Sequence, residues 1–218
     1  MSVSRRLTER IIGQRNSSIG GQMRERRWQK LLDEFPELPQ MRVLDVGGEI
    51  QFWRNLSVRP ANVTMVNVMA QPQPEEDWVT AVQGDGCSLP RNMGEFDLVF
   101  SNSVIEHVGG HWRREQFAAE VRAASARYWV QTPYRYFPVE PHFLFPFFQH
   151  FPRAIQARIA VAWPIGNFTI LKDPGVALQR VQETELIGLA EMRHYFPDAE
   201  LLRERVAGLT KSLVAIKR

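Results

Sequence analysis

The sequence lacks several features that would define its surroundings. Cys87 is the only cysteine in 218 residues, which excludes an internal disulfide and favours a reducing compartment, so we expect a cytoplasmic protein. No run of about 20 apolar residues occurs, so a membrane-spanning helix is not expected. The N-terminus shows no apolar core of a signal peptide. Internal repeats and low-complexity segments are also missing, and the composition is that of a globular protein.

The chain has little net charge. A formal net charge of +3 argues against binding to nucleic acid through overall charge. The basic residues are nevertheless concentrated near the N-terminus, where they fit a solvated helix face better than a phosphate- or membrane-facing patch. They are Arg5, Arg6, Arg10, Arg15, Arg24, Arg26, Arg27 and Lys30.

Apolar segments and turn residues alternate in the order of an α/β protein. We expect one domain over residues 1–218, with a helical extension at 1–39 that includes a helix at 21–34. Further helices are expected at 113–124 and at 183–195, the latter capped by Thr184. The alternation predicts a Rossmann-like, mostly parallel seven-stranded sheet with helices on both faces and a C-terminal antiparallel hairpin. Its strands are expected at 42–46, 63–68, 78–82, 96–101, 128–131, 200–206 and 212–217.

One segment interrupts this alternation. Residues 133–174 are rich in aromatic residues and proline and are too long for a simple connection. Long connections in compact domains are usually lids or insertions, so we expect a lid over an acceptor site. The part at 151–163 also has arginines beside apolar residues, and contact with a membrane surface is an alternative for it.

Glycines and polar residues follow several of the expected strands. Asp45, Gly47 and Gly48 end the first strand, and glycine allows a sharp turn and a close approach to a ligand. Asn67 ends the second strand, near the about 20-residue offset expected for a ribose-binding side chain. The carboxyl ends of parallel strands share one edge of a sheet, which predicts a nucleotide-like site there. Gly84, Asp85 and Gly86 follow the third strand, and residues 101–107 follow the fourth.

These segments resemble class I S-adenosylmethionine-dependent methyltransferases over roughly residues 40–216. The motifs that carry the resemblance are VLDVGG at 43–48, VQGDG at 82–86, FDLVFSNSVIEHV at 96–108 and GLTKSLVAI at 208–216. The stretch VQTPYRYFPVEPHFLFPFF at 130–148 is similar to a bacterial, type 11-like subgroup.

The resemblance implies S-adenosyl-L-methionine as cofactor and a small-molecule or lipid- or sugar-linked acceptor. Asp45 would organise the loop of Gly47 and Gly48 beside the amino-acid part of the cofactor, and Asn67 would meet the ribose. The adenine would lie by Asp85, Gly86 and Cys87, and the methionine part by Ser101 and Asn102.

The chain departs from the family pattern at two positions. The residues at 49–51, beginning with Glu49, stand where a third glycine is usual, and Asn67 stands where an acidic residue is usual. A relic that has lost catalysis therefore stays open as an alternative, as does a nucleic-acid methyltransferase that uses the basic N-terminal region. A nicotinamide-dependent oxidoreductase is disfavoured by the missing G-x-G-x-x-G and by the terminal hairpin.

Histidines near the expected methyl donor suggest O-methylation. His107, His111 and His142 are candidate bases, because a neutral imidazole can accept the proton of a hydroxyl at neutral pH, and His107 and His142 are the two that we select as catalytic. No metal is expected: Glu106, His107 and His111 lie close in sequence, but Gly109 and Gly110 interrupt any regular helix between the histidines. The sequence does not predict the oligomeric state.

Overall fold

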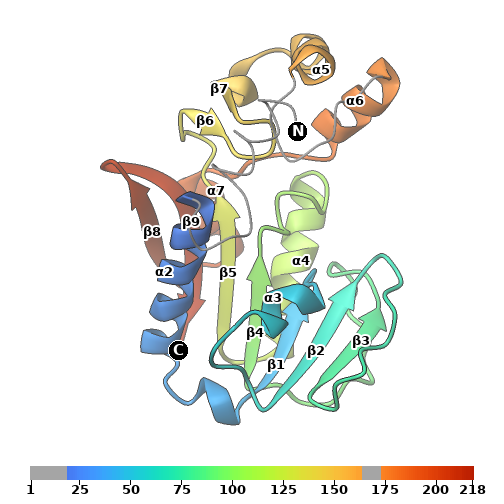
Figure 1. Cartoon of the computed structure of the whole chain (residues 1–218), viewed down its shortest axis with the longest axis vertical. Coiled ribbons are helices and arrows are strands. Elements are labelled where there is room, and N and C mark those ends of the chain that lie inside the picture. The colour runs from blue at the N-terminus through green and yellow to red at the C-terminus, as the bar shows by residue number, and fades with distance from the viewer. Residues whose placement is uncertain (1–18, 164–172) are drawn as a thin grey trace.

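The computed structural model describes residues 19–163 and 173–218. Its centre is a seven-stranded sheet with the strand order β3-β2-β1-β4-β5-β9-β8. The strands β1 to β5 are parallel, and β9 is antiparallel to both β5 and β8 (Figure 1). Their bounds are β1 Arg42–Val46, β2 Asn62–Asn67, β3 Val79–Gln83, β4 Leu98–Asn102, β5 Tyr128–Pro133, β8 Glu200–Val206 and β9 Leu209–Lys217. This topology confirms the predicted fold class.

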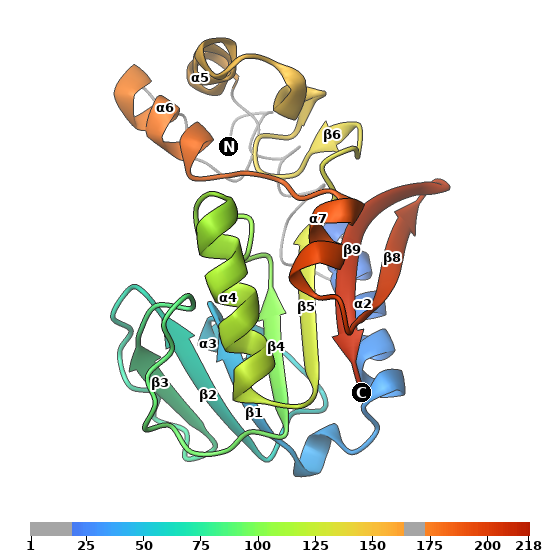
Figure 2. The same cartoon turned by 180° about the vertical axis from the view of Figure 1, so that it is seen from behind.

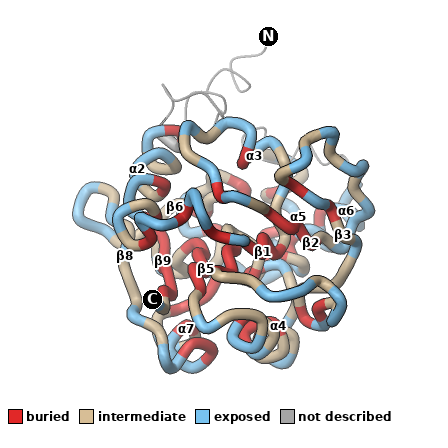
Figure 3. Tube along the Cα trace, turned by 90° about the horizontal axis from the view of Figure 1, so that it is seen from below, coloured by how far each residue is buried: buried red, intermediate tan, exposed pale blue. Residues whose placement is uncertain are grey.

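Helices cover both faces of this sheet (Figures 1 and 2). On one face, α2 (Ile19–Glu34) and α3 (Ile50–Arg54) bury Trp28, Leu31 and Trp53 against the strands. On the other face, α4 (His111–Ala124) and α7 (Leu189–Tyr195) bury Phe117 and Met192. The central strands are buried almost completely, as is usual for parallel sheets with two covered faces (Figure 3).

The aromatic segment forms a compact layer of its own beyond the sheet. It contains β6 (Val139–Glu140), β7 (Phe145–Pro146), α5 (Arg153–Ala162) and α6 (Pro174–Gln182), and Phe143 stacks on Phe148 in its small core. Two 3-10 helices, at Leu38–Gln40 and Phe148–His150, complete the described elements. The arrows of β1, β2, β4 and β5 point toward this layer in Figure 1, so it lies over the carboxyl ends of the strands.

The helix predicted at 183–195 is wrong in its first half. The chain is extended there: Glu185 N donates to Glu106 O at 2.9 Å, and Ile187 pairs with Tyr134. The helix begins at Leu189 after Gly188. Thr184 does not cap this helix, because its Oγ1 donates to Arg180 O at the end of α6. Tertiary contacts thus override the helical pattern of these residues.

Two sequence-based expectations can be compared with the described residues only. None of the helices within 19–163 and 173–218 is long and apolar enough to cross a membrane. Arg5, Arg6, Arg10 and Arg15 lie outside the described residues, as do residues 164–172 of the expected lid.

Candidate active site

A cavity of about 270 Å³ opens at the carboxyl edge of the sheet. Five of the predicted site residues line it, coming from four different strand ends: Gly47, Asn67, Asp85, Gly86 and His107. The topology therefore brings together residues that lie up to 60 positions apart in the sequence. Ser103 and Val104, from the segment expected after the fourth strand, also line the cavity, as does Arg113, which the sequence did not indicate.

The loop after β1 has space for glycine only. Gly47 has a φ of +84°, in the left-handed region, and its N donates to Val66 O at 2.7 Å. A Cβ at Gly47 would overlap the Val104 side chain, and one at Gly48 would overlap the Asp45 carboxylate. Any side chain at either position would have to displace its neighbours, so the close backbone approach expected here depends on both glycines.

Asp45 lies beneath this loop, outside the cavity lining. Its side chain is buried, and Trp53 Nε1 donates to its Oδ2 at 2.6 Å. Its Oδ1 is buried without a hydrogen-bond partner in the described part of the chain. Burial raises the pKa of Asp45 to about 7, although the hydrogen bond from Trp53 opposes this. Asp45 is thus placed to support the glycine loop from below.

Asn67 is directed at the same loop from the neighbouring strand. Its Nδ2 lies 3.5 Å from Gly47 O and 3.4 Å from Gly48 O, while its Oδ1 accepts from Met69 N at 3.1 Å. A carboxylate at position 67 could not donate to these carbonyls. The replacement of the usual acidic residue therefore fits the local backbone.

Asp85 is paired with a residue that no sequence motif indicated. Arg113, in the first turn of α4, donates to its Oδ1 at 2.9 Å and its Oδ2 at 2.7 Å, and Cys87 N donates to Oδ1 at 2.9 Å. Partial burial opposes ionisation of Asp85, but these hydrogen bonds and the charge of Arg113 hold its pKa below the usual value. Asp85 is therefore an ionised acceptor on the cavity wall.

Of the next two residues, Gly86 lines the cavity and Cys87 is buried behind this wall. A Cβ on Gly86 would lie 2.8 Å from Val46 Cγ1, so the strand-to-loop turn also needs glycine here. The Cys87 thiol is buried and lies 3.2 Å from Arg113 O, and burial raises its pKa to about 11. Cys87 can thus contribute through its backbone, but its side chain is not a nucleophile at neutral pH.

Besides Asp45, Gly48 and Cys87, two further predicted cofactor residues do not line the cavity. The buried Ser101 Oγ donates to Val46 O at 2.9 Å and joins β4 to β1. Asn102 Oδ1 accepts from Arg27 Nη1 at 2.7 Å, on the side of the sheet covered by α2. The cavity wall at this point comes instead from Ser103 and Val104, one and two residues further along the chain.

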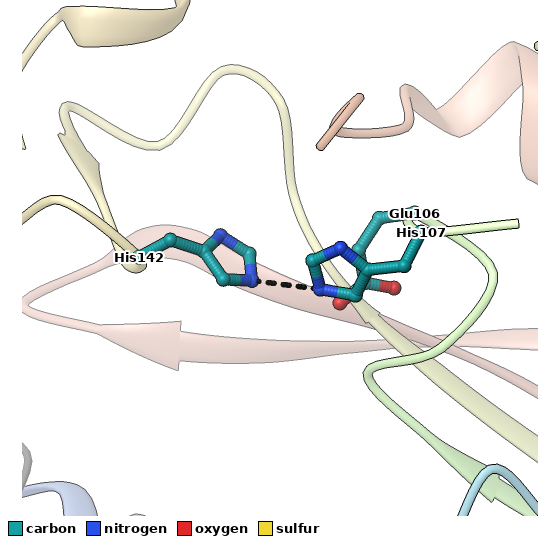
Figure 4. Close-up of side chains that lie close together, drawn as sticks. All are labelled: Glu106, His107 and His142. Atoms are coloured by element: carbon teal, nitrogen blue, oxygen red, sulfur yellow. Dashed lines mark hydrogen bonds between the residues drawn. The ribbon is translucent and has the colours of Figure 1, made fainter. Parts of the chain in front are cut away.

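The two candidate bases meet at the cavity (Figure 4). His107 Nε2 lies 3.2 Å from His142 Nε2, although the residues are 35 positions apart. His107 Nδ1 lies 3.2 Å from Glu183 O, and His142 Nδ1 lies 2.6 Å from Glu140 Oε1. His111 does not join them, because its Nδ1 lies 2.9 Å from Tyr195 Oη.

Two buried carboxylates flank this histidine pair. Glu140 Oε2 accepts from the backbone N of His142 at 2.8 Å and of Phe143 at 2.6 Å, which fixes it in place. Glu106 Oε2 accepts from Thr132 Oγ1 at 2.9 Å. Burial disfavours a charged His142, but the hydrogen bond and charge of Glu140, with the charge of Glu106, raise its pKa above the usual value.

A second cavity, of about 390 Å³, lies beneath the aromatic layer. Glu140 is part of its wall, so Glu140, His142 and His107 form a continuous chain of contacts between the two cavities. Phe143 and Phe148 are the aromatic residues among its lining side chains, most of which are polar or charged. Arg114, Arg135 and Arg153 pair there with Glu185 and Glu191.

Comparisons with known proteins agree with this geometry. A family described as a methyltransferase domain matches residues 44–125, which span β1 to α4. No curated protein matches the chain.

Solved structures show the same fold at low sequence identity. A DhpI–SAH complex has a TM-score of 0.53 at 16% identity and covers 93% of this chain and 88% of its own. Magnesium protoporphyrin IX methyltransferase (ChlM) from Synechocystis PCC 6803 with bound SAH has a TM-score of 0.50 at 14% identity, covering 92% and 84%. The N-methyltransferase NodS from Bradyrhizobium japonicum WM9 has a TM-score of 0.51 at 10% identity, covering 89% and 95%.

The methyltransferase match covers the loops that form the first cavity, and the sheet order with its antiparallel β9 extends the same fold to the C-terminus. Residues 44–125 thus match a methyltransferase domain, and the whole chain shares its fold with solved methyltransferase structures.

Proposed function

We propose that this chain is an S-adenosylmethionine-dependent methyltransferase and that it methylates a hydroxyl group of an acceptor that enters from the second cavity. The observation that carries the proposal is the contact between His107, on the wall of the first cavity, and His142, whose partner Glu140 lies on the wall of the second. The fold alone does not select the acceptor, since NodS, an N-methyltransferase, shares it.

The first cavity fits the cofactor at the level of individual residues. Gly47 and Gly48 form a turn in which any Cβ would overlap Val104 or Asp45. Asn67 lines the cavity where the ribose is expected, and Asp85 offers carboxylate oxygens where the adenine amino group is expected. When bound, S-adenosylmethionine supplies an activated methyl group for in-line displacement. The protein aligns the acceptor oxygen with this methyl group and removes the hydroxyl proton.

The histidine pair is arranged to receive that proton. Glu183 O accepts from Nδ1–H of His107, which leaves Nε2 as the basic nitrogen of this ring. That nitrogen faces His142, which Glu140 holds in orientation through Nδ1. The proton of the acceptor would pass to this pair as the oxygen attacks the methyl group.

The charged lining of the second cavity favours a polar acceptor over a purely apolar one. Arg114 is buried, and its guanidinium contacts both Glu185 and Glu191. A small or sugar-linked acceptor with several hydroxyl groups could replace some of these contacts. A lipid-linked acceptor is supported by Phe151 and Ile155, which are 39% and 41% exposed on the outside of the aromatic layer.

The test compares His107→Ala and His142→Ala with His194→Ala, an exposed histidine outside this chain of contacts. Transfer of tritium from methyl-labelled S-adenosylmethionine into metabolites of a deproteinised extract reports turnover on any acceptor that the extract contains. We expect losses of about 10²–10⁴-fold for the first two variants, with unchanged affinity for S-adenosylhomocysteine and a smaller loss at high pH. Equal turnover in all three variants would contradict the proposal.

A further inference from the structure

Three potential metal-binding side chains converge at the meeting point of the two cavities (Figure 4). One ligand atom each from Glu106, His107 and His142 lies within 4.8 Å of the other two. Glu106 and His142 are buried, whereas His107 is exposed to the first cavity. No sequence motif combines them, because His142 follows the other two by 35 residues or more.

Glu106 has an oxygen that the described residues leave without a partner. Its Oε2 is held by Thr132, but Oε1 is buried and accepts no hydrogen bond in the described part of the chain. An unpaired carboxylate oxygen at 1% residue exposure is costly, and such groups are normally paired or bound to a metal ion.

Both histidines are oriented as metal ligands usually are. A metal-bound histidine typically donates its other ring N–H to a carboxylate or a backbone carbonyl. His142 Nδ1 is directed at the Glu140 carboxylate, and His107 Nδ1 is directed at Glu183 O. With a proton on each Nδ1, both Nε2 atoms present lone pairs toward each other, and a cation between them would satisfy both.

The separation of the two nitrogens fits a single ion. Two nitrogens bound at 2.0–2.1 Å to a tetrahedral zinc ion lie about 3.3–3.4 Å apart. The observed separation of His107 Nε2 and His142 Nε2 is 3.2 Å.

We propose that Glu106, His107 and His142 bind one divalent first-row transition metal ion of the Zn²⁺ type. Two imidazoles and one carboxylate form a three-ligand set that leaves a coordination position open. The open position would face the first cavity, which His107 lines.

The consequence for catalysis rests on the proposed function. A hydroxyl acceptor bound at the open position would lose its proton more readily, because a bound cation stabilises the alkoxide. His107 and His142 would then act as ligands, and the proton would leave the bound hydroxyl for solvent or for a carboxylate at the site. The attacking oxygen would keep its electron pair for the new bond to the methyl carbon.

The experiment measures metal binding without any acceptor. Full-length protein is stripped with a chelator and titrated with Zn²⁺ by calorimetry, and with Co²⁺ by visible absorption. All measurements use a His194→Ala background, because His111, Glu115 and His194 form a second, exposed group of potential ligands. We expect one Zn²⁺ per chain and a Co²⁺ spectrum that Zn²⁺ abolishes.

Variants then locate the ion. His142→Ala and Glu106→Gln should lower Zn²⁺ affinity at least 100-fold. Glu140→Gln, which weakens the support of the His142 ring but is not a ligand, should lower it about 10–100-fold. Unchanged circular dichroism and unchanged affinity for S-adenosylhomocysteine show that a variant is folded. The absence of Zn²⁺ binding to folded protein, or equal binding by all variants, would overturn the proposal.

The two proposals fail in different ways. If Zn²⁺ binds but the methylated product carries its methyl group on nitrogen or carbon, the site stands and O-methylation is wrong. If an O-methylated product forms at the same rate after chelation, and no Zn²⁺ is bound, the metal site is wrong and the histidine pair acts as the base.

Discussion

Asparagine in place of Asp45 should make the stability of the protein less dependent on pH. In the folded state, burial raises the pKa of Asp45 from 3.8 to about 7. Between these two values the unfolded chain has released the proton while the folded protein still holds it, so stability falls as the pH rises. Well below pH 4 the group contributes nothing, and well above pH 7 its penalty is complete.

The magnitude follows from the size of the shift. Each pKa unit corresponds to 1.36 kcal/mol, so the complete penalty is about 4 kcal/mol. Most of it develops over the accessible range: between pH 5 and pH 8 the free energy of unfolding should fall by about 2–3 kcal/mol through Asp45 alone. The side chain introduced by Asp45→Asn cannot ionise, and its amide oxygen can still accept the hydrogen bond from Trp53.

Urea unfolding followed by tryptophan fluorescence at several pH values would measure this effect. The difference in unfolding free energy between Asp45→Asn and the wild type should change by about 2–3 kcal/mol in favour of the variant between pH 5 and pH 8. Asp77→Asn, which alters an exposed aspartate, serves as the control and should give a constant difference. A constant difference for Asp45→Asn as well would show that Asp45 is ionised throughout and that the argument from burial is wrong.

Three further results are expected. Gly47→Ala should abolish binding of S-adenosylhomocysteine in calorimetry, while Gly208→Ala, at a φ of +82° but in open space, should bind normally; equal affinities would refute the role of the loop. Asp85→Ala should cost about 1.5–3 kcal/mol of cofactor affinity, and Arg113→Gln clearly less, because only the carboxylate is expected to meet the adenine. Equal losses would mean that Asp85 acts only as the structural partner of Arg113. The double variant His107→Ala/His142→Ala should lose no more turnover than the less active of the two single variants, because the two rings act as one unit. If the double variant instead shows the product of the two single losses, the rings act independently.

The sheet could be predicted because its strands leave little ambiguity. Val43–Val46 and Leu98–Ser101 are short apolar runs that are buried on both faces, and glycine or polar residues follow each of them directly. The rule that parallel strands end at one edge then predicts which loops meet. Gly47, Asp85 and His107 meet in one cavity for this reason.

Residues at the same edge can still face different surroundings. Side chains alternate along a strand, so a shift of one residue changes the side of the sheet, but this alternation stops where the strand ends, as at Ser103 with its φ of +58°. Asn102 faces α2 and pairs with Arg27, whereas Ser103 and Val104 face the cavity. The sequence indicates which strand ends contribute to the site, but not which of two neighbouring side chains does so.

Contacts between distant elements could not be predicted from the sequence, and the two contacts of His142 show why. The Glu140–His142 contact is local, since the residues lie two positions apart and the turn at Pro141 brings the ring back to the carboxylate. The contact of His142 with His107 depends on how the whole aromatic layer lies over the sheet, which no local pattern encodes. The four-residue spacing of His107 and His111 does not place them on one helix face, as Gly109 and Gly110 indicated, because Gly109 has a φ of +107° and α4 begins only at His111. A catalytic or metal-binding unit assembled across such an insertion is therefore visible only when both its halves have been placed in space.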